Sequence, residues 1–437
     1  MREADRPLEI RPIPGPLRAT VSVPGSKSLT NRALVIAALA DGESILRGVL
    51  DSDDTRHMVA ALERLGFAID WDRGAATLRI GGRGGEIPAR GAELFGGNAG
   101  TTVRFLTSLV ALGHGRFRID GDPRMRERPI QDLLDCLVAL GVDAVSERAN
   151  GCPPVIVEAS GFAGGDARVA GETSSQFTSS VLLVAAYAAR GVRLRVTGAA
   201  VGRPFVDMTI GLMQRAGVAV DRGGDDISVS GGQRYRSGEL SIEPDATAAS
   251  YFLAAAALVG GEVKVRGLGG GSLQGDLAFC EVLASMGASI RSDPDGIVVR
   301  GGALRGIDHD FREISDTFLT AAALAPFASS PTRIRGIAHT RRQETDRVSA
   351  VARELSRLGV RVQESEAELR IEPSAVTGGD VETYDDHRMA MSFALIGLRV
   401  PGIRIRNPRC VDKTFPDYFE RLDSLRRKEA RDGGRGA

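Results

Sequence analysis

The sequence has few aromatic residues and few cysteines, and it has neither an excess of one charge nor a long apolar run. Aromatic residues make up 5% of its 437 residues, so the core must be packed largely with Ala, Leu and Val. Four cysteines lie far apart, with no CxxC pair and no His at metal-ligand spacing. This pattern argues against a disulfide framework or a zinc site and favours a reducing compartment.

The charges balance, with 56 Lys plus Arg against 56 Asp plus Glu, so no global field favours nucleic acid or a membrane as partner. The first ten residues, MREADRPLEI, lack the apolar segment of a secretory signal. Apolar runs also fall short of membrane-spanning length. We therefore expect a cytoplasmic protein, and any anionic ligand would need cations gathered locally in a cleft.

A repeat organises the chain. A helical segment that ends at a glycine and is followed by a short strand recurs at intervals of 70 to 76 residues, with glycines at Gly66, Gly141, Gly217, Gly287 and Gly359. Each glycine stands where a left-handed helix C-terminus is expected. A second helix recurs in the same period, with starts near Ser28, Gly100, Ser174, Asp245, Asp316 and Asp386. Ser and Asp are good N-cap residues, because their side-chain oxygens accept hydrogen bonds from backbone N–H groups of the first turn, and this supports the predicted helix starts.

Six such units of helix, strand, helix, strand and strand predict two domains of three units each. The last unit ends on its helix, so the N-terminal segments LEIRPI and LRATVSV are expected to complete it. This assigns residues 28–243 to one domain, and residues 1–27 with 244–437 to the other. The chain would then cross between domains near Pro24–Lys27 and near Glu243–Asp245, where hinge motion is a hypothesis.

Unusual polar residues gather at the predicted helix starts, where free backbone N–H groups and the helix dipole favour anions. Lys27, Ser28 and Arg32 begin the first helix, although cations in a first turn oppose the dipole. Ser174, Ser175 and Gln176 supply three adjacent donors, more than N-capping requires. The remaining starts bring glycine-rich and cationic stretches, FGGNAGTTVR and YDDHRMA. Periodic helices alone would indicate packing, but these residues indicate an anion-binding site.

The segments PGSKSLTNRAL, DSDDTRHM, NAGTTVRFL, PRMRERPI, SSQF, ETDR, DDHRMAMSFA and KTFPDYF closely resemble the signatures of the 5-enolpyruvylshikimate-3-phosphate synthase family, in that family's order. The resemblance implies an α/β fold of two similar domains, each built from three βαβαββ units, an arrangement also described as an inside-out α/β barrel. It implies transfer of the enolpyruvyl group of phosphoenolpyruvate to the 5-hydroxyl of shikimate 3-phosphate, without metal or cofactor. A monomer is expected, because closure of two domains needs no partner.

The resemblance also implies residue roles. Shikimate 3-phosphate would be bound by Lys27, Ser28, Arg32, Ser174, Ser175, Gln176, Arg203, Asp316, His339 and Gln343. Phosphoenolpyruvate would be surrounded by Lys27, Gly100, Arg128, Gln176, Arg347, Arg388 and Lys413. Asp316 matches the catalytic aspartate and is expected to take the hydroxyl proton. Glu344 is expected to protonate the methylene carbon, and Lys27 to assist phosphate departure.

Several positions depart from the family pattern. Gln343 stands where Lys is usual and His339 where Asn is common. Gly202 and Phe205 replace familiar contacts of the acceptor, and Phe105 replaces a proline. Gln343 removes a cation that Arg203, Arg341 or Arg342 would have to restore.

Three alternatives remain open on the sequence. A sister enzyme that uses UDP-N-acetylglucosamine would carry a loop cysteine, which residues 121–130 lack. An RNA-end-processing cyclase would want a basic strip and a nucleotide-accepting His. The balanced charge and the five His, none of them in a recognisable nucleotide motif, argue against it. A paralogue with a different cyclic or sugar acceptor would keep the same catalytic residues.

Overall fold

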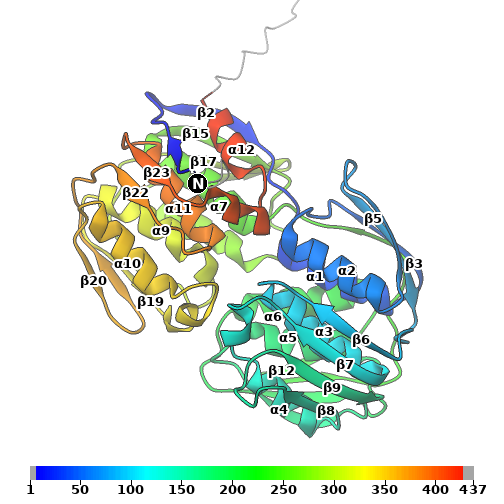
Figure 1. Cartoon of the computed structure of the whole chain (residues 1–437). Coiled ribbons are helices and arrows are strands. Elements are labelled where there is room, and N and C mark those ends of the chain that lie inside the picture. Colours follow the sequence, from blue (N-terminus) through cyan, green and yellow to red (C-terminus); the bar gives the residue numbers. More distant parts are fainter. Residues whose placement is uncertain (1–5, 427–437) are drawn as a thin grey trace, which may run out of the picture.

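The computed structural model describes residues 6–426, which form two bodies (Figure 1). Buried apolar side chains fall into two clusters without a common member. One cluster runs from Leu29 to Ile242 and defines the N-terminal body. The other combines Ile10–Val23 with Ala248–Leu425 and defines the C-terminal body. Residues 1–5 and 427–437, which the sequence-based domain assignment includes, lie outside the described residues.

The N-terminal body contains three units of the same order. The first comprises β14 (Glu239–Ser241), α1 (Lys27–Leu39), β3 (Asp41–Arg47), α2 (Asp53–Arg64), β4 (Ala68–Asp72) and β5 (Thr77–Arg83). The second comprises β6 (Gly91–Phe95), α3 (Gly100–Leu109), β7 (His114–Asp120), α4 (Gln131–Ala139), β8 (Asp143–Ser146) and β9 (Val155–Ser160). The third comprises β10 (Gly165–Ala170), α5 (Ser175–Ala185), β11 (Val192–Thr197), α6 (Arg203–Arg215), β12 (Asp221–Gly223) and β13 (Asp226–Val229).

The C-terminal body repeats this order. Its first unit comprises β2 (Leu17–Val21), α7 (Ala246–Val259), β15 (Gly261–Arg266), α8 (Phe279–Ser285), β16 (Ser289–Asp293) and β17 (Gly296–Arg300). Its second comprises β18 (Asp308–Asp310), α9 (Phe318–Leu324), β19 (Thr332–Arg335), α10 (Arg347–Arg357), β20 (Val362–Glu364) and β21 (Leu369–Ile371). Its third comprises β22 (Gly379–Val381), α11 (His387–Gly397), β23 (Ile403–Ile405), α12 (Tyr418–Ser424) and β1 (Leu8–Ile10).

Each unit forms its own small sheet with one parallel pair, such as β6 with β7, and antiparallel pairs beyond it. The predicted class of two-domain α/β repeats is confirmed. The fate of the two N-terminal strands differs from the prediction in one respect. β1 does complete the last unit, antiparallel to β23, but β2 runs parallel to β15 and opens the fourth unit. Figure 1 shows β2 in blue beside β15 and the red α12.

The helices that begin each period lie inside the bodies, and the sheets lie outside. Helices α1, α3 and α5 contact one another in the N-terminal body, as do α7, α9 and α11 in the C-terminal body. In α1 every residue from Leu29 to Leu39 is buried, including polar ones. This is the inside-out arrangement that the family resemblance implies. No helix in residues 6–426 has both the length and the apolar character required to cross a membrane.

The five periodic glycines end the outer helices as predicted. All have φ between 85° and 106°, a range that residues with a side chain rarely adopt. At Gly66, the glycine donates its N–H to the carbonyl of Glu63, and the next residue Phe67 donates its N–H to the carbonyl of Leu62. These two bonds form the Schellman pattern, and both recur at the other four glycines. The repeat therefore has a local cause that the sequence displays directly.

The chain crosses between the bodies at two adjacent points. Ser26 donates its N–H to the carbonyl of Glu243 at 2.8 Å, and Asp245 donates to that of Pro24 at 2.8 Å. Asp245 also caps α7 and accepts a hydrogen bond from the N–H of Lys27. The two crossings thus form one short antiparallel bridge that immediately precedes the start of α1.

Candidate active site

One cavity lies where the starts of the buried helices from both bodies meet. It is lined by Lys27, Ser28, Arg32, Thr101, Arg128, Thr173, Ser174, Ser175, Gln176, Val201, Gly202, Phe205, Ser315, Asp316, His339, Gln343, Glu344, Arg347, His387 and Arg388. Five of these side chains are Lys or Arg, in a chain without net charge. The cations are therefore concentrated locally, as the sequence predicted for an anionic ligand.

Arg32, in α1, is 1% exposed and is surrounded by neutral acceptors. Its Nε donates to Thr209 Oγ1 at 2.7 Å, and its Nη atoms donate to the carbonyls of Ser28 and Phe205 at 2.9 and 3.1 Å. The guanidinium also stacks 5.3 Å from the centre of the Phe105 ring. Burial lowers the pKa of Arg32 to about 9. Among residues 6–426 it has no carboxylate partner, so its charge is left for a ligand.

Arg104, in α3, has the same character. Its Nη1 donates to Gln176 Oε1 at 2.6 Å, and its Nη2 to the carbonyl of Pro129 at 3.1 Å. Burial, followed by the nearby Arg128, lowers its pKa to about 9. Ser174 caps α5, so the hydroxyl groups of Ser174 and Ser175 and the amide of Gln176 surround a helix start beside two under-compensated cations. This wall suits a phosphate.

The opposite wall holds its arginines in ion pairs. Arg347 is 1% exposed and contacts Asp386 at 2.7 Å, Glu344 at 2.9 Å and Asp316 at 3.1 Å. Its Nη1 also donates to Gln343 Oε1. Arg388 contacts the other oxygen of Asp316 at 2.6 Å. Burial opposes the charge of Arg347, but the three carboxylates outweigh it and raise its pKa.

Asp316 and Glu344 are both held as carboxylates. Burial works against ionisation of Asp316, but Arg388, Arg347 and Lys27 outweigh it and lower its pKa. Burial likewise opposes ionisation of Glu344, and Arg347, Arg128 and Lys413 hold its pKa well below the ordinary value. In the unliganded site both groups are therefore proton acceptors at neutral pH.

A lysine pair joins the two bodies beneath Glu344. Asp54, at the start of α2, contacts Lys27 Nζ at 3.1 Å and Lys413 Nζ at 2.7 Å. Lys413 also donates to the carbonyl of Asn98 at 2.8 Å. Arg124 adds hydrogen bonds to the backbone carbonyls of Gln343 and Glu344. The Lys413–Asp54 ion pair and the hydrogen bonds of Arg124 therefore connect the N-terminal body to the C-terminal body.

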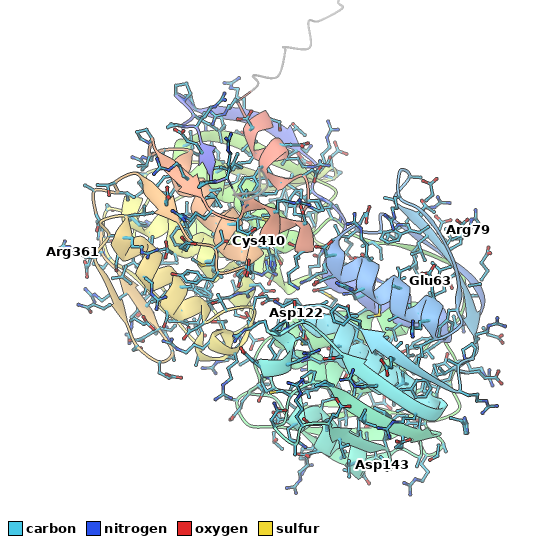
Figure 2. All side chains as sticks on the ribbon, in the orientation of Figure 1. Glu63, Arg79, Asp122, Asp143, Arg361 and Cys410 are labelled. Atoms are coloured by element: carbon cyan, nitrogen blue, oxygen red, sulfur yellow. The ribbon has the colours of Figure 1, made fainter. Side chains whose placement is uncertain are left out.

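Glu344 also faces an open cleft between the bodies on the side away from Arg32. Asp122 and Cys410 line this cleft, and Figure 2 labels both. The other labelled charges, such as Glu63, Arg79 and Arg361, lie at outer edges of the bodies. Glu344 thus separates the cavity from an exposed surface.

Gly100 begins α3 beside the cavity. A methyl group at this position would lie 2.8 Å from Arg128 Nη2 and 3.3 Å from Arg104 Nη1. Arg128 Nη1 donates to the carbonyl and side-chain oxygens of Asn98 at 3.0 and 3.1 Å. Glycine therefore lets the Arg128 and Arg104 guanidinium groups lie close against the start of α3.

Thirteen of the predicted binding and catalytic residues line the cavity, and three do not. Gly100 is adjacent to the cavity. Lys413 does not line it, but its Nζ lies 3.8 Å from Oε1 of Glu344, which does, and it also contacts Asp54. Arg203 was predicted to bind the acceptor, but it lies outside the cavity. It occupies the first position of α6, its side chain is 53% exposed near Asp225, and its N–H is bound by Glu313.

The cation absent at Gln343 is not restored by a neighbour. Arg341 directs its donors to Asp346, Glu364 and the carbonyl of Ser365, and Arg342 is exposed. Neither side chain lines the cavity. His339 does line it, with Nε2 2.8 Å from Ser315 Oγ, and burial lowers its pKa to about 4. This part of the wall is therefore neutral.

Sequence reasoning did not assign roles to Asp54, Arg104 or Asp386. Asp54 falls in the DSDDTRHM segment, but an acid in the first turn of a helix is ordinary dipole compensation and gives no separate signal. Arg104 follows Gly100 by one turn, which is the one sequence feature that places it near the site. Asp386 is visible only as an N-cap, although its carboxylate also holds Arg347.

The chain resembles known proteins over nearly its whole length. The family model for EPSP synthase (3-phosphoshikimate 1-carboxyvinyltransferase) matches residues 12–422. A 3-phosphoshikimate 1-carboxyvinyltransferase of Nostoc punctiforme is 48% identical, covering 95% of this chain and 98% of its own. One from Shewanella baltica is 45% identical, covering 94% and 97%. The structure of an EPSP synthase from Acinetobacter baumannii has a TM-score of 0.81 at 24% identity, covering 96% and 98%, which shows a common fold.

Proposed function

The chain belongs to the EPSP synthase family, and on that premise we propose how its cavity transfers the enolpyruvyl group of phosphoenolpyruvate to the 5-hydroxyl of shikimate 3-phosphate. One observation carries the proposal. A single cavity between the bodies holds two carboxylates, a lysine and four arginines, which suits two anionic reactants that repel each other. Each charge-assisted hydrogen bond contributes roughly 1.5–3 kcal/mol toward offsetting that repulsion.

The reaction needs three proton transfers, because the 5-hydroxyl loses a proton, C3 gains one and the resulting methyl group later loses one. The acceptor hydroxyl attacks C2 of phosphoenolpyruvate while C3 gains a proton, which gives a tetrahedral phosphate ketal. The C2–O bond to phosphate then breaks, inorganic phosphate leaves and the methyl group loses a proton, which restores the alkene. Positioned acids and bases typically contribute about 10²–10⁴-fold each to such steps.

We propose that shikimate 3-phosphate occupies the wall formed by the N-terminal body, with its phosphate at Ser174 and Ser175. Lys27, Ser28, Arg32 and Gln176 complete this side, and His339 and Gln343 face it from the other body. Arg203 is left out of the proposal, because its exposed side chain points elsewhere. Phosphoenolpyruvate would lie against Arg128, Arg347, Arg388 and Lys413, with Gly100 and Gln176 beside it.

Asp316 is proposed as the base for the 5-hydroxyl, since Arg347 and Arg388 keep it ionised and ready to accept a proton. Glu344 is proposed as the donor to C3, and for this it must first bind a proton. Phosphoenolpyruvate brings negative charge to Arg128, Arg347 and Lys413, the groups that hold the Glu344 pKa down. Substrate binding would therefore raise that pKa toward the working pH, and Lys27 would assist the departing phosphate.

Three further features belong to the proposal. The bodies 28–243 and 1–27 with 244–437 would move as domains about the paired crossings at Ser26 and Asp245, completing the site when they close. The enzyme would act as a monomer. It would work in the cytoplasm, in the synthesis of chorismate and aromatic amino acids.

The test is phosphate release from phosphoenolpyruvate, first with shikimate 3-phosphate and then with UDP-N-acetylglucosamine as acceptor. Release with shikimate 3-phosphate alone, largely lost in Asp316→Ala, is the expected result. A folded protein that releases phosphate only with another cyclic or sugar acceptor would contradict the proposed acceptor, and would show that Gln343 and His339 mark changed specificity.

A further inference from the structure

A second polar cavity adjoins the first, at the crossing between the bodies, and we call it the lower cavity. It is lined by Ser26, Lys27, Ser28, Phe205, Met208, Asp245, Thr247, Ala248, Tyr251, Gln274, Asp276, Arg388, Met391 and Thr414. Lys27, Ser28, Phe205 and Arg388 line both cavities. Asp276 lines only the lower one, and none of the roles above uses it.

Asp276 is 4% exposed and is held at one oxygen only. Its Oδ2 accepts a hydrogen bond from Thr247 Oγ1, in the first turn of α7. Its Oδ1 has no partner among residues 6–426. A buried carboxylate oxygen without a partner is costly, so a polar guest is expected at that atom.

Arg388 presents the complementary atom to the same cavity. Its Nη2 donates to Asp316 at 2.6 Å and its Nη1 to Tyr251 Oη at 3.4 Å, but its Nε has no partner within the described residues. Thr414 Oγ1 is also unpartnered within them and also lines the cavity. A donor and an acceptor without partners, facing one polar space, are the features of a site for ordered water.

We propose that Asp276 is a positioning residue that holds the Arg388 guanidinium through water in this cavity, and so governs the affinity for phosphoenolpyruvate but not for shikimate 3-phosphate. The proposal rests on the role of Arg388 proposed above. The other charged groups that face Asp276 are Asp316 and Asp245, which repel its charge, and Lys27 lines the same cavity. Arg388 is the cation that lowers the pKa of Asp276 most strongly.

Asp276→Asn tests this role without changing side-chain size, and it keeps a group that bonds to Thr247. We expect KM for phosphoenolpyruvate to rise about tenfold, the loss of one hydrogen bond to a charged group, while the Kd of shikimate 3-phosphate by calorimetry stays within about twofold. Asp295→Asn is the control, an acid of the same body whose side chain is 83% exposed. An unchanged KM in folded Asp276→Asn would overturn the proposal.

A double-mutant cycle separates positioning from a structural role. Arg388→Lys removes the Nε donor, so Asp276→Asn should add little to the KM of Arg388→Lys if the two residues act through one another. If the effects of the two substitutions on KM are fully additive, the residues act independently and the proposal is contradicted. Thermal unfolding measures any loss of stability in Asp276→Asn separately.

The pH profile gives a third readout. Burial, followed by Asp316, raises the pKa of Asp276 to about 7, so the carboxylate gains its charge between pH 6 and 8. An ionised Asp276 holds Arg388 better, so the KM for phosphoenolpyruvate of the wild type should fall over this range relative to that of Asp276→Asn. A constant ratio of the two KM values would count against the proposal. If the wild type forms no product, the proposed function fails instead, and calorimetry with phosphoenolpyruvate still tests Asp276.

Discussion

Buried arginines at the two walls of the cavity, or directly behind them in the case of Arg104, lie under opposite conditions. In the N-terminal body, Arg32 and Arg104 donate to hydroxyl, amide and carbonyl oxygens, and burial lowers the pKa of each to about 9. In the C-terminal body, Arg347 and Arg388 contact carboxylates that raise their pKa values. Arg32 and Arg104 lie in the first half of α1 and α3, and Arg347 and Arg388 lie in the first turn of α10 and α11, so all four are near helix starts while the charge environment differs.

This difference shows how one repeat can build two kinds of anion site. A buried cation without an acid is costly in the free protein and gains its counterion from the ligand. A cation saturated by carboxylates costs less, but it must exchange partners when a ligand arrives, and the released carboxylate then becomes available for proton transfer. The first arrangement serves binding, and the second serves chemistry.

The largest expected effect is on catalysis at the carboxylate-rich wall. Asp316→Asn keeps the shape of the side chain but removes the base, so kcat should fall by about 10²–10⁴-fold. Asp308→Asn, an exposed acid of the same unit paired with Arg335, should leave kcat unchanged. The measurement is steady-state phosphate release. A loss of less than tenfold would show that the hydroxyl proton leaves by another group.

The second prediction compares the walls directly through stability. Arg347→Met leaves Asp386, Glu344 and Asp316 without their shared cation, so the free energy of unfolding should fall by about 3–5 kcal/mol. Arg32→Met leaves Thr209, Ser179 and the carbonyl of Phe205 bonded to one another. Its unfolding free energy should stay the same or rise by about 1 kcal/mol.

Urea denaturation of the unliganded variants measures both values. The comparison between the walls fails if the two substitutions destabilise the protein equally. In that case the neutral shell around Arg32 would stabilise its charge as well as carboxylates do.

The same contrast marks what the sequence could predict. The helix starts at Ser174, Asp245 and Asp386, and the glycines that end the outer helices, follow from local capping chemistry and were predicted correctly. Cations at the starts near Ser28 and Asp386 indicated an anion site because they oppose the dipole.

Local signals, however, do not reveal partners. Glu344 stands three residues before Arg347 and is its only nearby acid partner in sequence, whereas Asp316 and Asp386 lie 31 and 39 residues away. The sequence therefore does not show that Arg347 contacts three carboxylates while Arg32 contacts hydroxyl groups.

Long-range placement was the other limit. The alternating pattern of β1 and β2 predicts strands, but β2 has no feature that selects the sheet of β15 over that of β23. Arg203 follows a glycine in a left-handed conformation at the start of α6, and its outward direction depends on that backbone geometry. Asp54 contacts Lys27 within its own unit and Lys413 across the bodies, and no local pattern in the sequence indicates either contact.

A smaller effect concerns binding at the wall without carboxylates. Arg32→Met should raise the Kd of shikimate 3-phosphate about 10–100-fold, because the ligand loses a buried cation and its charge-assisted hydrogen bonds. Arg32→Lys should recover only part of this loss, since an ammonium cannot hold Thr209 and Phe205 in the same fork. Calorimetry measures both. Full recovery by lysine would show that charge alone matters.

The fourth prediction concerns pH. Because the folded pKa values of Asp316 and Glu344 are lowered, both groups stabilise the protein above their unfolded values of about 3.9 and 4.3. This stability is lost progressively as pH falls below those values and through the lower folded pKa values. We expect Tm to fall on acidification from pH 6 to below 4, and Glu344→Gln to flatten the fall. Arg32→Met should leave the slope of this fall unchanged, because no carboxylate of residues 6–426 contacts Arg32. A steeper fall in Glu344→Gln would show instead that the folded protein binds the Glu344 proton more tightly than the unfolded chain does.

The smallest expected effect tests the one predicted acceptor residue that lies outside the cavity. Arg203→Ala should change the KM for shikimate 3-phosphate by less than about twofold, since its side chain is 53% exposed and its guanidinium lies 4.0 Å from Asp225, outside the cavity. Arg32→Met is the matched comparison on the same body. If Arg203→Ala instead raised the KM as strongly as Arg32→Met, the side chain would have to swing inward when the bodies close. The charge missing at Gln343 would then be supplied by movement, and Arg203 would join Lys27, Arg32 and Arg128 at the cavity only when the bodies close.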